Sequence, residues 1–370
     1  MTGIPSLPRG LADIGSVNGD GVQRFAPRSV DEIVSVVEAL KAARVTALPV
    51  GAGSTFEDVP PPDVDVVVSA SAYAGLIDYQ PDDLTVVVRA GTTLGTLAEA
   101  LEAKGQTAVL PETSPERTIG GVVSSGASGF RRLRYGPTRD RVLGVTLVTG
   151  YGKPVKGGGA LVKNVTGYDL PRLCTGSHGT LGFIADICLK LWPMQPASRT
   201  IEVADVNEAR FAIYKPLAVL ETPDAVMVMV EGSEASVSDT ERVLDGASRT
   251  GLLWPDPPSS AVNVSVRVPA SSTTSAISVV RGAGAEHFVA QHGIGRVDAG
   301  FASLPPGAVE ELRSRTAELR GVAIITGWKT ADQMPDRWGV NPGSAGISER
   351  LTSLFDPAGV FRIGQLPGGL

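Results

Sequence analysis

The chain has 370 residues, of which 42% are hydrophobic and 19% are charged, and its formal net charge is −6. This composition predicts a folded core over a length that suits two domains, and it excludes global disorder. The sequence has no basic block, no apolar run of bilayer length and no secretory signal, which disfavours nucleic-acid binding, a membrane span and export. We therefore expect a cytoplasmic protein.

The N-terminal part alternates helix and strand. Ser29 and Glu32 have the spacing of a capping box, and the apolar residues that follow recur at helical spacing. This pattern predicts a helix over residues 30–43. Strands are expected at 45–50, 64–69 and 84–90, and a second helix is expected at about 93–104.

The middle of the chain, residues 111–193, is dense in glycine. Short runs of Val, Ile, Thr and Leu separate the glycines, a pattern that is typical of ordered turns and not of a flexible linker. We expect short β-like runs here, wrapped around a large anionic cofactor.

A change in composition after Pro196 predicts a second α+β domain. Its strands are expected at 225–230 and 261–268, and a helix is expected at about 306–320. A last helix is expected at about 346–355, ended by Asp356-Pro357.

The loop Gly51-Ala52-Gly53-Ser54 directly follows a predicted strand. Its glycines let the backbone approach a diphosphate, and successive N–H groups can form an anion-binding nest. Phe56 replaces the third glycine of a Rossmann motif, and the prolines at 60–62 prevent the long helix that such a site needs. By itself the loop is equally compatible with a plain tight turn.

The order of these motifs resembles the flavin domain of the vanillyl-alcohol oxidase and p-cresol methylhydroxylase (PCMH) family over residues 24–196, with a tail at about 347–370. Three segments are similar to the smaller FAD-binding flavoprotein subunits of bacterial glycolate oxidases: LysAsnValThrGlyTyrAsp at 163–169, GlySerHisGlyThrLeuGly at 176–182 and PheAspProAlaGlyValPhe at 355–361. The resemblance implies an α+β fold: a two-subdomain PCMH-type FAD-binding domain (1–197), an α+β cap domain (198–335) and a C-terminal segment (336–370) whose helix returns to the FAD domain.

The resemblance also implies a set of FAD contacts. They are Gly51, Ala52, Gly53, Ser54, Thr55, Pro111, Thr118, Gly120, Gly121, Gly126, Ser128, Gly129, Tyr135, Gly182 and Ile184. Many family members carry a histidine in the first loop that bonds covalently to the flavin. Residues 51–56 contain neither His nor Cys, so we expect non-covalent FAD.

Glycolate oxidation to glyoxylate is the activity that the resemblance implies, with electrons passing to an iron–sulfur partner. The implied partners are a larger flavoprotein subunit and an iron–sulfur subunit, which could also hold the chain at the inner face of the plasma membrane. Related dehydrogenases carry a metal cluster in the cap that is missing here. We therefore expect the larger partner to carry the main oxidation site.

Oxidation of a 2-hydroxy acid needs a cation for the carboxylate and a base for the hydroxyl proton. The candidate cations are Arg296, Lys329 and Arg337, and the candidate bases are His287 and His292, with Lys329, Arg337 and His292 preferred. For each of these residues the alternative is an ordinary role, a solvated surface charge for the cations and a structural histidine for the bases. His178 lies within the expected flavin wrap, where we expect it to support the loop.

The two cysteines, Cys174 and Cys188, are too few for a disulfide framework, a cysteine-based zinc site or a four-cysteine iron–sulfur site. We expect half-buried thiols and no metal site, so that redox chemistry depends on an organic cofactor and an external electron acceptor. Two alternatives stay open: a stand-alone FAD oxidase or dehydrogenase for a hydroxy acid or sugar alcohol, and a non-catalytic assembly subunit that has kept the flavin fold.

Overall fold

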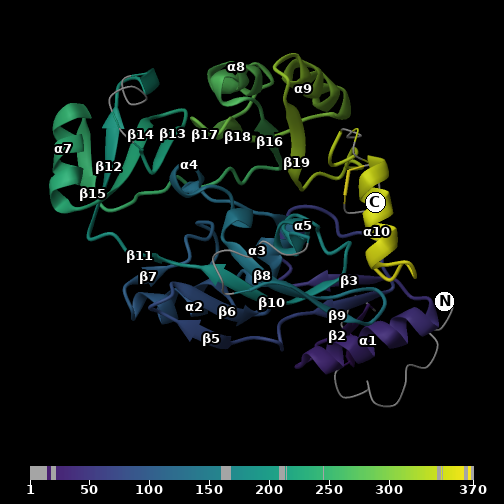
Figure 1. Cartoon of the computed structure of the whole chain (residues 1–370). Helices are drawn as coiled ribbons and strands as arrows, with labels where there is room; N and C mark the ends of the chain where they lie inside the picture. The colour runs from purple at the N-terminus through teal and green to yellow at the C-terminus, as the bar shows by residue number, and fades with distance from the viewer. Residues whose placement is uncertain are drawn as a thin grey trace.

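The structure is a computed structural model that describes residues 15–17, 22–159, 168–207, 213, 215–244, 246–339, 343, 345–361 and 366–367. The chain forms an N-terminal domain and a second domain that sits above it in Figure 1. All but the last two residues of the motif at 163–169 lie outside the described residues, as does part of the predicted C-terminal segment.

The first subdomain is a small sheet of strand order β1-β2-β4-β3, in which β2, β4 and β3 run parallel. Its elements are β1 (Gly15–Val17), β2 (Gln23–Phe25), α1 (Val30–Ala43), β3 (Ala47–Val50), the short 3-10 helix η2 (Ser54–Phe56) and β4 (Val66–Ser69). The predicted cap of α1 is present, because the Ser29 hydroxyl accepts from the Glu32 N–H at 3.1 Å. The Glu32 carboxylate accepts from the N–H of Arg28, one residue earlier than a capping box requires.

The second subdomain is a five-stranded antiparallel sheet of order β5-β6-β10-β8-β9. Its elements and flanking segments are β5 (Leu76–Gln80), β6 (Thr85–Arg89), α2 (Leu94–Glu102), β7 (Gln106–Thr107), α3 (Ile119–Ser125), α4 (Arg132–Tyr135), the 3-10 helix η3 (Thr138–Asp140), β8 (Val142–Val148), β9 (Pro154–Gly158), α5 (Leu170–Cys174), β10 (Phe183–Lys190) and β11 (Trp192–Pro193). One hydrophobic core joins both subdomains, from Phe25 and Ile33 to Leu147 and Phe183. Burial on this scale fixes the two small sheets relative to each other.

Three short helices, α3, α4 and α5, lie within residues 111–193, where the sequence predicted β-like runs. Residues 119–125, expected as a β-like run with a glycine turn, form helix α3, whose N-cap Thr118 accepts from the Gly121 N–H at 3.2 Å. Glycine is required at position 120, because a Cβ there would lie 2.7 Å from the Cβ of Ala90, the residue that follows β6. The glycines reflect close helix–sheet packing, which single-residue propensities do not reveal.

The second domain is an eight-stranded antiparallel sheet of order β15-β12-β14-β13-β17-β18-β16-β19. Its elements are β12 (Ala197–Val203), β13 (Ala218–Glu221), β14 (Val226–Gly232), α7 (Glu234–Leu244), β15 (Ala247–Thr250), β16 (Val262–Arg267), the 3-10 helix η4 (Ala270–Ser272), α8 (Thr273–Gly282), β17 (His287–Gln291), β18 (Arg296–Phe301), α9 (Pro306–Glu318) and β19 (Val322–Trp328). Helices α7, α8 and α9 cover the outer face, so the other face of the sheet is turned toward the N-terminal domain (Figure 1).

The chain returns to the N-terminal domain through α10 (Ala345–Phe355). Directly after the helix, the Asp356 carboxylate accepts from the N–H groups of Val360 and Phe361 at 3.0 and 2.6 Å. Phe361 is fully buried in the core of the N-terminal domain, and the Val360 carbonyl accepts from the N–H of Ala47 on β3. The expected return of a C-terminal helix to the FAD domain is confirmed.

Candidate functional site

The loop after β3 presents a row of free donors. Within the described chain, the backbone N–H groups of residues 51–55 and the hydroxyls of Ser54 and Thr55 donate to no other group. Gly53 adopts a left-handed φ of 83°, which turns the backbone at the centre of this row. Unpaired N–H groups around a glycine turn suit the diphosphate of a dinucleotide such as FAD.

Close packing holds this loop against α3. A Cβ at Gly51 would lie 1.9 Å from the Thr118 Oγ1. The same hydroxyl caps α3, so it cannot move away without exposing a helix N–H group. The fit between Gly51 and Thr118 therefore sets the distance between the two walls of the site.

A first cavity lies between these walls. Ten of the predicted FAD contacts line it: Gly51, Ala52, Gly53, Ser54, Thr55, Thr118, Gly120, Gly121, Gly182 and Ile184. Arg117 and His178 also line it, and neither was among the predicted contacts.

A second cavity of about 740 Å³ lies between the two domains. Four more predicted contacts line it, namely Pro111, Gly126, Ser128 and Gly129, as do the candidate anchors Arg296 and Arg337. The two cavities share five lining residues: Ser54, Thr55, Arg117, Ser125 and His178. The two cavities therefore adjoin each other, the first at the donor loop and the second under the second domain.

Tyr135 is not brought to either of these cavities. Its hydroxyl donates to the carboxylate of Glu231, and its ring meets Trp192 edge to face at 5.5 Å. It lines a separate cavity of about 380 Å³. The short helix α4 turns the Tyr135 side chain toward the second domain, so the predicted FAD contact at this position is not supported.

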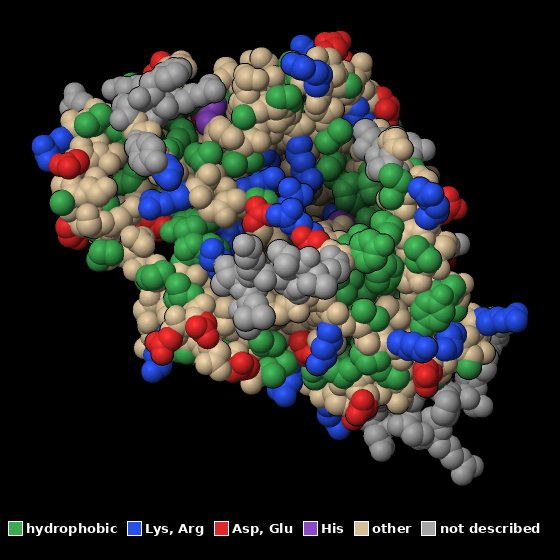
Figure 2. Space-filling view, in the orientation of Figure 1, with side chains coloured by type: hydrophobic (Ala, Val, Ile, Leu, Met, Phe, Trp, Pro, Cys, Tyr) green, Lys and Arg blue, Asp and Glu red, His purple; other side chains and the backbone are tan. Residues whose placement is uncertain are grey.

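Arginines dominate the interdomain cavity. Figure 2 shows basic side chains gathered in the hollow between the domains. The arginines that line it are Arg117, Arg132, Arg139, Arg267, Arg296 and Arg337. Burial is the first cause that lowers the pKa of Arg117, Arg132, Arg267 and Arg337, and the charge of Arg296 lowers those of Arg132 and Arg267 further. Arg267 is exposed by surface area because its side chain lines the cavity. The cavity walls nevertheless displace water around the guanidinium, and this loss of hydration lowers its pKa.

Three carboxylates line the same space, but each has a protein partner. Glu112 accepts from Arg131 Nε at 2.5 Å, Asp298 pairs with Arg296 at 2.8 Å, and Asp58 pairs with Lys329 Nζ at 2.6 Å. The cavity therefore carries an excess of positive charge, which favours an anionic ligand.

Two of the three candidate anchors face the cavity. Arg296 also donates to the carbonyl of Ser128 at 3.1 Å, so it bridges the two domains, and Arg337 donates from Nε to the carbonyl of Ile325 at 3.3 Å. Lys329 does not line the cavity, because its ammonium is bound to Asp58.

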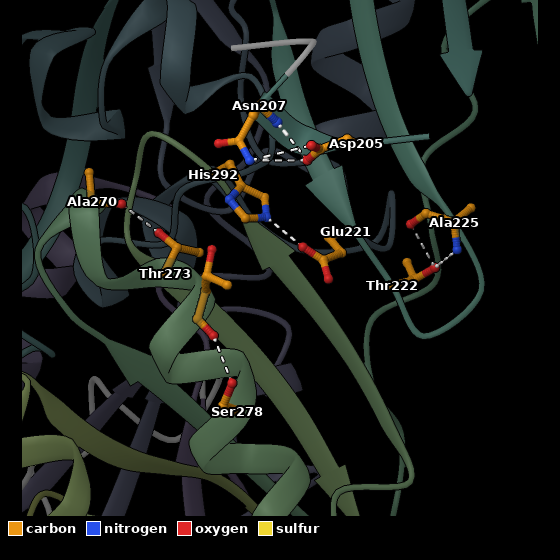
Figure 3. Close-up of polar contacts among 10 residues, drawn as sticks. Asp205, Asn207, Glu221, Thr222, Ala225, Ala270, Thr273, Ser278 and His292 are labelled. Carbon is orange, nitrogen blue, oxygen red and sulfur yellow. Dashed lines mark hydrogen bonds and ion pairs between the residues drawn. The ribbon is translucent and has the colours of Figure 1, made fainter. Parts of the chain in front are cut away.

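The candidate bases lie elsewhere. His292 Nε2 is 2.8 Å from Glu221 Oε2 and the side chain is buried beside β13, as Figure 3 shows. Successive residues at the end of β17 point to opposite sides, so Gln291 lines the cavity and His292 does not. His287, at the start of β17, does not line it either. The structure therefore does not support His292 as the base.

His178 is the histidine that lines both cavities. Burial, followed by the charges of Arg337 and Arg267, lowers its pKa to about 4, so the imidazole is neutral at neutral pH. Its ring nitrogens have no hydrogen-bond partner in the described chain, and its backbone φ is 51°. A left-handed φ at a residue other than glycine often marks a functional constraint. In the sequence, the position of His178 within the glycine-rich stretch 176–179 was the feature that could have indicated this role.

The cysteines and the potential metal ligands of the described residues point to no thiol or metal chemistry. Cys174 and Cys188 are buried, not half-buried as expected, and burial raises their pKa values to about 12 and about 11. Over the described ranges, no group of three or more His, Cys, Asp or Glu residues is arranged to hold a metal ion. None of the helices in that part of the chain combines the length and apolarity needed to cross a membrane.

Comparison with known families and relatives supports the cofactor assignment. The sequence matches the FAD binding domain family over residues 23–158. It is 37% identical over 194 residues to glycolate oxidase subunit GlcE of Escherichia coli (strain K12), covering 49% of this chain and 55% of that protein. Glycolate oxidase subunit GlcD of Bacillus subtilis (strain 168) is 34% identical over 180 residues, covering 48% and 38%. D-2-hydroxyglutarate dehydrogenase of Xanthomonas citri pv. viticola is 32% identical over 226 residues, covering 57% and 48%.

The chain thus spans about half the length of the curated relatives it matches. Among solved structures, an alkyldihydroxyacetonephosphate synthase aligns with a TM-score of 0.64 at 15% identity, over 92% of this chain and 75% of that one. This match reports on the fold alone. Together these findings confirm FAD as the cofactor, the PCMH-type fold and the resemblance to glycolate oxidase subunits.

Proposed function

Residues 23–158 are an FAD binding domain, and on this premise we propose that the chain oxidises a small 2-hydroxy acid as one subunit of a glycolate oxidase-type complex. The observation that carries the proposal is that the cavity at the donor loop, residues 51–55, adjoins the arginine-lined cavity. If the diphosphate of a dinucleotide binds at the loop, the flavin end of the molecule can extend toward the second domain. The arginines of the second cavity attract an anionic acid there.

Within the cavity, Arg337 and Arg296 bind the carboxylate of the acid through charge-assisted hydrogen bonds. Arg296 uses Nε for Asp298 and Nη1 for Ser128, so its Nη2 group is the one left for the acid among the described contacts. Gln291 is 3% exposed and its Oε1 accepts no hydrogen bond in the described chain, which leaves an unsatisfied acceptor in the cavity wall. FAD, when bound, supplies the acceptor for the hydride that leaves the hydroxyl-bearing carbon.

The hydroxyl proton requires a base, and we assign this role to His178. Its neutral imidazole has one ring nitrogen free to take a proton, and it stands in the wall that both cavities share. The bound acid adds negative charge beside the imidazole, which favours its protonated form. This assignment gives the chain an oxidation site of its own, in place of the expectation that the larger partner carries the main site.

Electrons must then leave the chain, because its two buried cysteines cannot hold an iron–sulfur cluster. GlcE and GlcD are both named as subunits of glycolate oxidase, which supports a complex here too. We propose a larger flavoprotein subunit and an iron–sulfur subunit as partners, with glycolate oxidation to glyoxylate as the simplest reaction of the class.

The test separates flavin reduction from turnover. Purified chain, loaded with FAD under anaerobic conditions, is mixed with glycolate and with each lactate enantiomer, and the visible absorbance of the flavin is followed. We expect bleaching by at least one acid without any partner, and sustained turnover only after a partner or an artificial acceptor is added. Intact flavin absorbance with every 2-hydroxy acid would contradict the proposal.

A further inference from the structure

Two arginines in the interdomain cavity have no hydrogen-bond or ion-pair partner among the residues that the structure describes. Arg132 lies at the start of α4 in the N-terminal domain, and Arg267 ends β16 in the second domain. Neither guanidinium is hydrogen-bonded or ion-paired to another described residue, although both line the cavity. By contrast, Arg296 in the same cavity is paired with Asp298.

The charges of these groups oppose one another. After burial, the charge of Arg296 is the next cause that lowers the pKa of both Arg132 and Arg267. Asp140 partly offsets the lowering at Arg132, and Asp298 partly offsets the lowering at Arg267, to which Arg132 and Arg337 also contribute. Holding like charges together in a partly dehydrated space is unfavourable unless an anion is bound there. Asp140 and Asp298 offset this repulsion only in part, and the arginines that line the cavity still outnumber its carboxylates.

The diphosphate of FAD has better-suited donors than Arg132 and Arg267. The free N–H groups that suit it lie in the loop at residues 51–55, and Arg117 is the arginine that lines the cavity beside that loop. Arg132 and Arg267 line only the part of the space that opens toward the second domain. They face the region left for the acid.

In the binding mode proposed above, the single carboxylate of a monocarboxylate such as glycolate engages Arg296 and Arg337, which leaves Arg132 and Arg267 without an anion. We propose that the cavity selects a 2-hydroxy acid with a second anionic group, a carboxylate or a phosphate, and that Arg132 and Arg267 bind this second group. The inference rests on the proposed oxidation of a 2-hydroxy acid and names its substrate class.

The experiment uses pairs of acids matched in length that differ in the second charge. D-malate is compared with D-2-hydroxybutyrate, and 3-phospho-D-glycerate with D-glycerate. Dissociation constants for the FAD-loaded chain are measured by calorimetry, and flavin bleaching by each acid is recorded separately. We expect the doubly charged member of at least one pair to bind about 10- to 100-fold more tightly, as charge-assisted hydrogen bonds to a second anion predict. The pair that shows the preference identifies a carboxylate or a phosphate.

Variants then assign the preference to residues. In Arg132→Met and in Arg267→Met, the ratio of the dissociation constants within a pair should fall toward one. Arg267→Lys keeps the charge and should retain part of the preference. Arg249→Met is the matched control, because Arg249 lies on the exposed edge strand β15 and lines neither cavity. The comparison of acids on the unmodified chain does not depend on whether any variant folds.

The outcomes separate the two proposals. If both members of each pair bind equally tightly, the inference is overturned. In that case, 2-hydroxy-acid oxidation still stands if any of the four acids bleaches the flavin. Tight binding of a doubly charged acid that bleaches no flavin leaves the anion site standing and contradicts the oxidation. A preference unchanged in both Arg132→Met and Arg267→Met overturns the residue assignment.

Discussion

The imidazole of His178 meets the ring of Trp338 edge to face, with 5.4 Å between the ring centroids. This contact joins the glycine-rich segment of the FAD domain to the segment that follows β19. It holds an uncharged imidazole among arginines at the junction of the two cavities.

His178→Asn should slow flavin reduction by about 100-fold, the typical contribution of a general base, while FAD stays bound. Asparagine is chosen because it tolerates the left-handed backbone at this position. The check is anaerobic stopped-flow bleaching together with the flavin-to-protein ratio. Unchanged bleaching with full flavin occupancy would remove His178 from the mechanism.

The same histidine should make stability depend on pH. Its pKa falls from an ordinary 6.5 to about 4 on folding, so between these values the unfolded state binds more protons. Stability therefore decreases as the pH falls through this window, by at most about 3 kcal/mol for this group. Denaturant unfolding at pH 5 and pH 7 should show a smaller loss for His178→Asn than for the unmodified chain. Equal losses would mean that the pKa of His178 is not lowered.

Gly51→Ala should weaken FAD binding by more than about tenfold and cost about 1–3 kcal/mol, because its Cβ overlaps Thr118 Oγ1 and overpacks the wall. The measurements are FAD titration by fluorescence quenching and denaturant unfolding. Gly307→Ala is the control, since no atom lies within 4 Å of a Cβ there. If Gly51→Ala binds FAD as Gly307→Ala does, the loop does not form the cofactor wall.

Arg337→Met and Lys329→Met should differ although both remove a cation after β19. Arg337 lines the cavity, so its loss should raise the dissociation constant of the acid about tenfold or more. Lys329 is committed to Asp58 in a half-exposed pair, so its loss should leave acid binding within about twofold. Calorimetry on both FAD-loaded variants tests this, and the reverse order would restore Lys329 as the anchor.

FAD should dissociate from the denatured chain, because residues 51–56 hold no His or Cys and neither Cys174 nor Cys188 lines the cavities. Acid precipitation followed by an absorbance spectrum of the supernatant checks this prediction. Flavin that stays with the precipitate would indicate a covalent bond.

The sequence was sufficient to find the cofactor site but not the chemistry of the acid. The loop at residues 51–55 could be located because a strand precedes it and the prolines that follow exclude a Rossmann helix. The prediction of His292 as the base depended on which face of β17 meets the cavity, and the sequence does not reveal that this face carries Gln291 instead. Arg132 and Arg267 are far apart in the chain, and only the packing of the two domains brings them together.

The helix at residues 119–125 was missed for a related reason. Its valines and glycines favour strands and turns when each residue is considered alone. Thr118 as N-cap and the contact of Gly120 with Ala90 override these preferences, and the second of these is a tertiary contact that no local pattern contains.

The most direct test of the central claim is anaerobic reduction of the FAD-loaded chain by a 2-hydroxy acid in the absence of any partner. The account predicts loss of the flavin's visible absorbance with formation of one equivalent of the 2-oxo acid per flavin. It also predicts that Arg296→Met and Arg337→Met slow this loss, while Arg249→Met does not. A chain that binds FAD fully and is reduced by no singly or doubly charged 2-hydroxy acid would contradict the account.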